Sequence, residues 1–170
     1  ADPAHAPLNE IVYAEFAADA DHVEIAATIT ERGIARQHRH LPVRPFDPAH
    51  HRFNDGRCDP QGRLLAGSMN EARDATTGAL YRLDPDFALT PLLSGMTISN
   101  GLAFSPDSRT MYHTDTNTQT VNGYAYDAAA GTPSRPRVLV RFTEEGDRPD
   151  GAAVDRDGCY WTALYRGGKV

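Results

Sequence analysis

The sequence has few lysines, few cysteines and no long apolar run. Of its 17 basic residues only Lys169 is a lysine, and 23 acidic residues bring the net charge to −6 at pH 7. Because a nucleic-acid surface needs clustered positive charge, this balance argues against a nucleic-acid partner. No apolar run approaches the roughly 18 residues of a membrane span. We therefore expect a soluble cytoplasmic protein that binds neither nucleic acid nor a membrane.

Motifs of several common enzyme classes are also missing. The spacing of Cys58 and Cys159 is typical of neither a disulfide framework nor a metal site, and the burial preference of cysteine predicts buried thiols. The chain has no Gly-x-Ser-x-Gly nucleophile elbow and no phosphate-binding glycine loop. Paired histidines at 38 and 40 and at 50 and 51 stand without a cysteine or acidic pattern, so we interpret them as loop residues rather than zinc ligands.

A polar residue followed by glycine occurs three times in comparable surroundings. The occurrences are Asn54-Asp55-Gly56, Asn100-Gly101 and Asp150-Gly151, and the glycines lie about 45 and about 50 residues apart. That period is typical of propeller blades. Each glycine begins a short run that ends in a turn cluster, and a second apolar run follows. The repeat therefore indicates consecutive copies of one structural unit.

Between residues 51 and 170 the apolar runs are short and separated by turn residues, which is the pattern of an all-β protein. The expected strands are 56–59, 63–69, 78–83, 88–93, 101–104, 110–114, 121–126, 137–142, 151–154 and 159–164. Four short strands per repeat are typical of a β-propeller blade. A β-sandwich is the competing interpretation. The recurring polar-glycine unit favours the propeller, with about two and a half blades in residues 51–170 and about three in the chain.

Residues 1–50 give weaker signals. We interpret them as a loop-rich segment that includes one or two edge strands and part of a further blade, with a strand-like run at 24–29. Residues 10–20 are compatible with a short helix instead. Prolines at 42, 45 and 48 exclude a regular helix there, and we expect residues 34–51 to be loop-rich with one or two edge strands.

The polar residues of the repeat are candidates for a binding site. In a propeller, the innermost strand of each blade begins at one rim of the central channel. Asp55 or its neighbour Asn54, together with Asn100 and Asp150, would then converge at the channel mouth. Carboxylate and amide oxygens suit hard divalent cations. The alternative is that these dipeptides are ordinary turn formers.

Several motifs occur in one order over residues 51–170. They read RFNDGRCDPQGRLLAG, GALYRLDPD, ISNGLAFSPD and PDGAAVDRDGCYWTALYRGGKV. In sequence and spacing this part of the chain resembles the regucalcin (senescence marker protein) and gluconolactonase family. The resemblance implies a six-bladed propeller that hydrolyses a sugar lactone with one divalent cation, which could be calcium, zinc, magnesium or manganese.

The resemblance also implies roles for individual residues. Asn100 and Asp150 match two of the family's metal ligands, and Asp150 also matches the residue that acts as general base. Arg52 and Asn54 match the residues that hold the oxygens of the substrate. Glu71 lies near a further substrate contact of the family, but the motif does not match there.

Two departures from the family pattern are visible. The family's remaining metal ligand is a glutamate in a Gly-Glu-Gly/Ser-Pro motif, and Glu10, Glu15 and Glu24 all have other neighbours. The sequence stops in the middle of a blade, and about two blades of family sequence are absent. We therefore expect a fragment or truncated product. A non-catalytic propeller segment that binds a ligand or partner on its rim is the alternative function, and a chain that does not fold by itself is a third.

Overall fold

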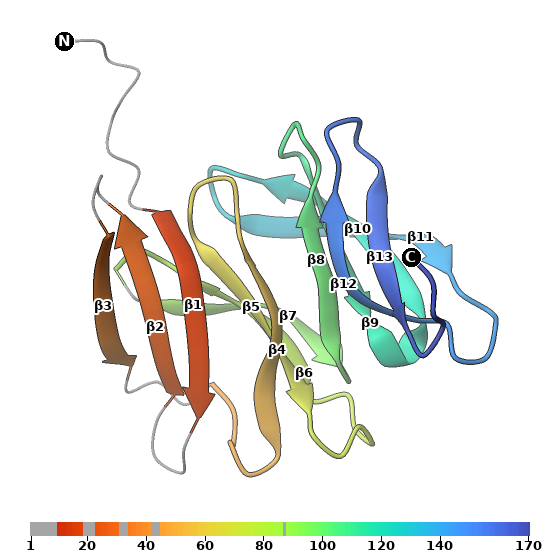
Figure 1. Ribbon diagram of the computed structural model, residues 1–170, viewed down its shortest axis with the longest axis horizontal. Coiled ribbons are helices and arrows are strands. Elements are labelled where there is room, and N and C mark those ends of the chain that lie inside the picture. Colours follow the sequence, from red (N-terminus) through yellow and green to blue (C-terminus); the bar gives the residue numbers. More distant parts are fainter. Residues whose placement is uncertain (1–9, 19–22, 31–33, 42–44, 87) are drawn as a thin grey trace.

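The structure is a computed structural model that describes residues 10–18, 23–30, 34–41, 45–86 and 88–170, with side chains from residue 45 onwards. The described strands form four antiparallel sheets that follow one another along the chain (Figure 1). The first sheet has the order β1-β2-β3, the second β4-β5-β6-β7, the third β11-β10-β9-β8 and the fourth β12-β13. Each sheet is therefore a meander of sequence neighbours.

The strand bounds follow the sheets. The first sheet contains β1 (Glu10–Ala18), β2 (Val23–Thr30) and β3 (Ile34–Leu41). The second contains β4 (His51–Cys58), β5 (Leu64–Asn70), β6 (Gly78–Leu83) and β7 (Leu89–Met96). The third contains β8 (Ser99–Phe104), β9 (Thr110–Asp115), β10 (Thr120–Asp127) and β11 (Thr132–Arg141), with the 3₁₀ turn η1 (Thr116–Thr118) before β10. The fourth contains β12 (Arg148–Val154) and β13 (Tyr160–Tyr165).

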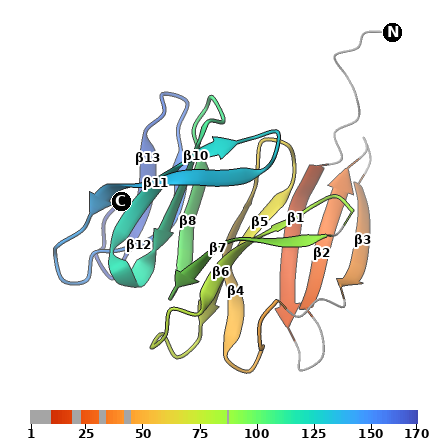
Figure 2. The same ribbon diagram turned by 180° about the vertical axis from the view of Figure 1, so that it is seen from behind.

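The first strands of the sheets lie side by side. β8 contacts both β4 and β12, and β1 contacts β4. Seen from behind, the fourth strands β7 and β11 lie in front of these inner strands (Figure 2). Meander sheets arranged around a row of inner strands are the blades of a β-propeller. The predicted all-β propeller with about three blades is therefore confirmed.

The described turns between β4 and β5, between β8 and β9 and between β12 and β13 are built from the same residue types. Asp59 accepts a hydrogen bond from the backbone N–H of Gln61 at 2.9 Å, and Asp155 accepts one from Asp157 at 2.9 Å. Aspartate side chains stabilise turns in this way. Gly158 adopts a φ of +88°, which only glycine reaches without strain. These local signals explain why the strand positions after residue 51 could be predicted.

The second blade is buried on both faces. On β5, the even-numbered Leu64 and Ala66 join a cluster with Phe53 of β4, whereas Leu65 belongs to a second cluster. The second cluster includes Leu102 of the third blade, so it fills the space between the two blades. Residues of alternate parity point to opposite faces of a strand, so both sets are buried only when both faces are covered. This packing fixes β4 against β8.

A buried ion pair joins the same two blades at another point. The guanidinium of Arg63 lies 2.7 Å from the carboxylate of Asp59, which also accepts a hydrogen bond from the hydroxyl of Tyr126 at 2.7 Å. Burial raises the pKa of Tyr126, and the adjacent Asp59 carboxylate raises it further. Arg63 also donates to the backbone oxygens of Ala128 and Ala129. The charges are thus paired and hydrogen-bonded, as buried charges must be.

Two expectations for residues 1–50 are wrong. The helix considered for residues 10–20 is the strand β1, which pairs with β2 from Glu10 to Ala18. Its Ile, Val, Tyr and Phe residues favour a strand, and sheet pairing outweighs the helix propensity of its Ala and Glu residues. His38 and His40, interpreted as loop residues, lie on β3, which is an edge strand of the kind expected for this segment. The prolines begin directly after Leu41 and end this strand instead of preventing it. The division between residues 50 and 51 stays a prediction.

Side-chain burial differs from expectation near the end of the chain. Cys159 is exposed, whereas Cys58 is partly buried. Trp161 is 54% exposed. Within the described residues the fourth sheet has only two strands, which leaves this surface uncovered. Of the residues that the structure describes, none forms a helix with the length and hydropathy that a membrane crossing needs.

Candidate functional site

The repeated polar-glycine motif forms a β-bulge in three inner strands. The pairing of β4 with β5 shifts register between Phe53 and Gly56, and that of β8 with β9 shifts between Asn100 and Ala103. The pairing of β12 with β13 shifts between Pro149 and Ala152. Bulges are common next to active sites because they redirect a side chain out of the regular alternation. The sequence repeat therefore corresponds to a β-bulge at the same position of three blades.

Asp55, in the first bulge, connects the second blade to the third. One carboxylate oxygen accepts a hydrogen bond from the backbone N–H of Leu102 at 2.9 Å, and the other accepts from Gly56 at 2.9 Å. Burial raises the pKa of Asp55, and these two backbone donors oppose the increase. Because both oxygens are used in this way, Asp55 fixes the blades rather than facing a ligand.

Asn100, in the second bulge, reaches Asp150 in the third. The amide nitrogen of Asn100 donates to the Asp150 carboxylate at 2.5 Å and also lies 3.1 Å from the hydroxyl of Thr116. The Thr116 hydroxyl donates to the backbone oxygen of Pro149 at 2.8 Å. Asn100 is 4% exposed, so its amide is held inside the protein with its partners. This chain of hydrogen bonds determines where the Asp150 carboxylate lies.

The turn η1 holds Thr116 in place. The buried carboxylate of Asp115 accepts hydrogen bonds from the backbone N–H groups of Thr97, Ile98 and Asn117, at 3.0, 3.1 and 3.2 Å. A carboxylate at the start of a helical turn satisfies donors that have no partner within the turn. Asp115 thus joins the beginning of η1 to the segment that enters β8, and Thr116 follows it directly.

Arg52 and Asn54 lie together on β4. A guanidinium nitrogen of Arg52 lies 3.3 Å from the amide oxygen of Asn54, whose nitrogen donates to the backbone oxygen of Ser99 at 3.0 Å. On its other side, Nε of Arg52 lies 2.9 Å from a carboxylate oxygen of Glu71. Glu71 follows β5, and Arg52 pairs in register with Met69 on that strand. The sheet register therefore brings Glu71 to Arg52.

These side chains surround one hollow of about 170 Å³. All four residues that the sequence predicted for the site line it, namely Arg52, Asn54, Asn100 and Asp150. The sequence left open whether Asn54 or Asp55 would face the site, and Asn54 does. Lining residues that sequence reasoning missed are Met69, Arg73, Ile98, Thr116 and Tyr165. The role of Asp115, which positions Thr116, could have been predicted from the sequence, because an aspartate before a short polar turn is typical of an N-cap.

Asn100 and Asp150 are the residues that could hold a cation. Both carry oxygen atoms of the kind that hard divalent cations prefer. In this structure the amide nitrogen of Asn100 faces Asp150, while its oxygen accepts from the N–H of Gly101 at 3.0 Å. Turning the amide over would bring its oxygen to the carboxylate, because the two ends of an amide have the same shape. Among the described residues, no group of three or more His, Cys, Asp or Glu side chains forms a ready site.

Comparison with known proteins relates this geometry to a family. Residues 16–170 match the family model described as SMP-30/Gluconolactonase/LRE-like region. The chain is 43% identical over 131 residues to the 6-deoxy-6-sulfogluconolactonase of Pseudomonas putida, an alignment that covers 76% of this chain and 45% of the relative. The chain thus spans about half the length of the proteins that it matches.

Solved structures give the same result. A calcium-binding protein, regucalcin, from Agrobacterium tumefaciens superposes with a TM-score of 0.71 at 26% identity, over 92% of this chain and 52% of that one. The Dos1 propeller superposes with a TM-score of 0.50 at 12% identity, over 88% of this chain and 42% of that one, which supports the fold alone. The match of the family model over nearly the whole sequence establishes that the chain belongs to the SMP-30/gluconolactonase/LRE-like family.

Proposed function

We propose that the chain provides part of the active site of a lactonase that hydrolyses a sugar lactone to the corresponding aldonic acid. The observation that carries the proposal is the convergence of Arg52, Asn54, Asn100 and Asp150 on one hollow from three neighbouring inner strands. The Pseudomonas putida relative is named as a lactonase that acts on a sulfonated gluconolactone, which supports this class of substrate. The proposal assigns each of the four residues a role.

Asp150 acts as the general base. Its carboxylate takes a proton from the water that attacks the lactone carbonyl carbon, and a bond forms between the water oxygen and that carbon. The bond between the carbonyl carbon and the ring oxygen then breaks, and the ring oxygen receives the proton. In this structure the amide nitrogen of Asn100 donates to one Asp150 oxygen at 2.5 Å. Catalysis of this kind requires the base within hydrogen-bond reach of the water.

Arg52 and Asn54 bind the substrate. The guanidinium group offers several N–H donors in a rigid plane, which suits the ring oxygen and hydroxyl groups of a sugar lactone. Its orientation is maintained by Glu71 at 2.9 Å and by the backbone oxygen of Phe53 at 2.9 Å. An amide can both donate and accept, which suits a hydroxyl group. The side chains therefore need little reorganisation when a substrate enters.

The proposal includes one divalent cation held by Asn100 and Asp150. Calcium, zinc, magnesium and manganese are the candidates, and the calcium-binding regucalcin of Agrobacterium tumefaciens favours calcium. When bound, the cation supplies positive charge that polarises the lactone carbonyl group. Asn100 would have to present its amide oxygen for this purpose. The side chains of Glu10, Glu15 and Glu24 lie outside the described residues.

The test is hydrolysis of glucono-δ-lactone, followed by acid release at constant pH after subtraction of the spontaneous rate. We expect Asp150→Ala to lower the catalysed rate by about 10²- to 10⁴-fold, the range for loss of a general base. A chelator should lower it too, and calcium should restore it. Asp157→Ala is the control, because Asp157 is an exposed carboxylate on a turn of the same blade. A catalysed rate that ignores both the chelator and Asp150→Ala would falsify the proposal.

A second candidate function is non-catalytic binding of a ligand or partner on the rim. The exposed aromatic side chains on β13 favour it, since Trp161 is 54% and Tyr165 44% exposed. Calorimetric titration with Ca²⁺, Zn²⁺ and Mn²⁺ discriminates the two candidates. Tight binding of one cation that is lost in Asp150→Ala would count against the non-catalytic function. A cytoplasmic location remains a prediction from composition.

A further inference from the structure

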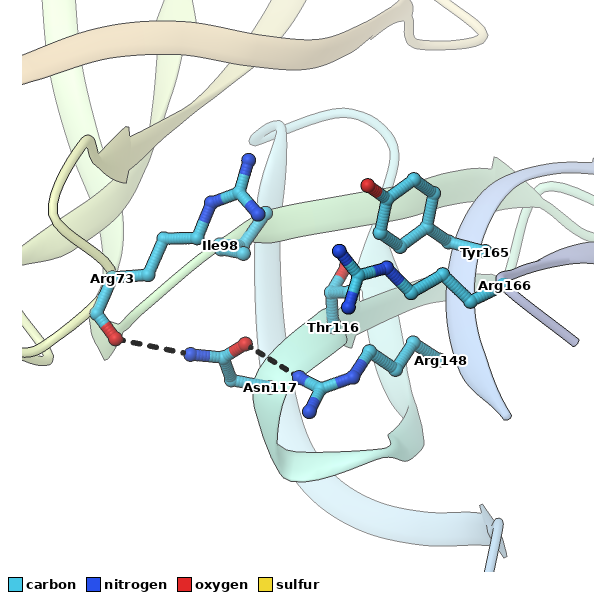
Figure 3. Close-up of a pocket in the computed structure, with 7 residues that line it drawn as sticks. All are labelled: Arg73, Ile98, Thr116, Asn117, Arg148, Tyr165 and Arg166. Carbon is cyan, nitrogen blue, oxygen red and sulfur yellow. Dashed lines mark hydrogen bonds between the residues drawn. The ribbon is translucent and has the colours of Figure 1, made fainter. Parts of the chain in front are cut away.

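Three arginines surround a second hollow beside the candidate site. Its volume is about 310 Å³, and its lining includes Arg73, Arg148 and Arg166. Arg73 lies in the connection from β5 to β6, Arg148 begins β12 and Arg166 follows β13. Figure 3 shows the guanidinium group of Arg166 extending over Thr116, and that of Arg148 extending toward Asn117. Positive charge is thus brought together from two blades and from distant parts of the sequence.

The charges of this cluster are not balanced within the described part of the chain. None of the ion pairs found there involves Arg73, Arg148 or Arg166. Arg148 donates to the amide oxygen of Asn117 at 3.0 Å, and Arg166 lies over the ring of Tyr165 at 5.5 Å. Like charges repel unless an anion or the solvent compensates them, so the arrangement favours an anionic ligand.

Asn117 restrains part of the arginine cluster through two hydrogen bonds. Its amide nitrogen donates to the backbone oxygen of Arg73 at 3.3 Å, and its amide oxygen accepts from Arg148 (Figure 3). One side chain of the third blade therefore joins the second blade to the fourth and restrains one guanidinium group. A restrained guanidinium loses less conformational freedom when it binds an oxyanion, which strengthens binding.

The arginine hollow and the candidate site are neighbours. The linings of the two hollows share Arg73, Ile98, Thr116 and Tyr165. The hydroxyl of Thr116 contacts Asn100 in the candidate site, while the next residue, Asn117, contacts two of the arginine positions. A molecule that occupies the candidate site can therefore extend a substituent toward the arginines.

We propose that the arginine hollow binds an anionic substituent of the lactone, a phosphate or sulfonate at the end of the sugar remote from the carbonyl. The inference rests on the proposed function, because it places the lactone ring between Arg52 and Asp150. Tetrahedral oxyanions present several acceptor oxygens in different directions, which matches donors that approach from different sides. A neutral substituent would leave the three guanidinium groups without compensation.

Binding of stable sugars tests the subsite without any hydrolysis. Calorimetry of the 170-residue chain compares glucose 6-phosphate, the sulfonate 6-deoxy-6-sulfoglucose, glucose and inorganic phosphate at fixed ionic strength. We expect both charged sugars to bind at least about 10-fold more tightly than glucose or inorganic phosphate. Arg166→Gln should weaken the charged sugars about 10-fold, a typical effect of losing one charge-assisted hydrogen bond. Arg156→Gln removes the same charge from a side chain that is 94% exposed outside the hollow and should have no effect.

Three outcomes would overturn the subsite. They are equal affinity for glucose and its 6-phosphate, affinity for inorganic phosphate as high as for the phosphorylated sugar, and equal losses in Arg166→Gln and Arg156→Gln. Different results would contradict the proposed function, namely that the chain hydrolyses no lactone or that hydrolysis does not depend on Asp150. Arg166→Lys provides a further check, since it keeps the charge and should restore part of the affinity. An unchanged melting temperature verifies that the Arg166→Gln chain is folded.

Discussion

The amide nitrogen of Asn100 lies 2.5 Å from a carboxylate oxygen of Asp150, although the two residues belong to inner strands of different blades. Each residue precedes the glycine of its own β-bulge. The contact is therefore a direct consequence of repeating one bulge in adjacent blades. It joins a buried neutral side chain to a carboxylate, so an ionisable residue in place of Asn100 would change the charge of the pair.

Replacing Asn100 by aspartate should make the stability of the folded chain depend on a divalent cation. Two adjacent carboxylates repel each other, and one of them would be buried, so we expect a loss of about 1 to 3 kcal/mol in a chelator. Calcium should restore the stability, because it binds between the two carboxylates. The measurement is the melting temperature with EDTA and with Ca²⁺. Asn122→Asp, on β10, adds the same charge away from the site and should show no calcium effect; a similar calcium response in both variants contradicts the prediction.

Glu71→Gln should weaken substrate binding with little effect on stability. The ion pair of Glu71 with Arg52 is about half exposed on both sides, and such pairs contribute about 1 kcal/mol or less. Without the carboxylate, Arg52 is less restrained, so we expect KM for the lactone to rise about 3- to 10-fold at constant kcat. Glu144→Gln removes the partner of Lys169 in another surface pair and serves as the control. A fall in kcat with constant KM would show that Glu71 acts differently.

Gly101→Ala should destabilise the chain, whereas Gly151→Ala should not. Gly101 has a φ of +58°, and an added Cβ would lie 2.5 Å from the Tyr160 hydroxyl and 2.8 Å from Cγ2 of Thr114. The strain and overlap together predict a loss of about 2 to 3 kcal/mol. Gly151 occupies the equivalent place in its bulge, yet an added Cβ meets no atom within 4 Å. Urea unfolding of both variants measures the difference, and equal losses would refute this account of the second bulge.

His113 should make the chain less stable in acid. The side chain is buried and lies 2.7 Å from the Ser99 hydroxyl, and burial lowers the pKa of His113 from 6.5 to about 4. A lowered pKa means that the neutral form is favoured in the folded state. The resulting stability is fully present above about pH 6.5 and is lost as the pH falls through about 4. At roughly 1.4 kcal/mol per pH unit, the loss amounts to about 3 kcal/mol.

The free energy of unfolding, measured in urea between pH 4 and pH 7, checks this expectation. His113→Gln should remove most of the change over that interval, because glutamine does not titrate. His50→Gln is the control, since the His50 side chain is 73% exposed. An unchanged pH dependence in His113→Gln would mean that other groups cause the acid sensitivity.

The strands after residue 51 could be predicted because local signals agree with the tertiary structure. Turn residues such as Asp59 and Asp155 form the same hydrogen bonds in the structure that their sequence context predicts. The strand β1 could not be predicted in this way. Its alanines and glutamates also favour a helix, and only pairing with β2, a non-local interaction, decides between the two.

Those residues of the candidate site that belong to the polar-glycine repeat could be predicted from the sequence. Asn100 and Asp150 could be placed together because equivalent positions of adjacent blades must be neighbours. Glu71 and Thr116 could not, because they lie in irregular connections and depend on register and capping. The arginine hollow follows no repeat at all: Arg73, Arg148 and Arg166 occupy unrelated positions of their blades.

The bulges also have a consequence for biosynthesis. Polar groups of β4 find their partners on β8, as Asn54 does at Ser99 and Asp55 does at Leu102, and Asn100 of β8 finds Asp150 on β12. Each blade is thus completed by groups that leave the ribosome after it. Because the chain leaves the ribosome N-terminus first, these polar groups of β4 and β8 have no partner until the following blade has been made and has docked.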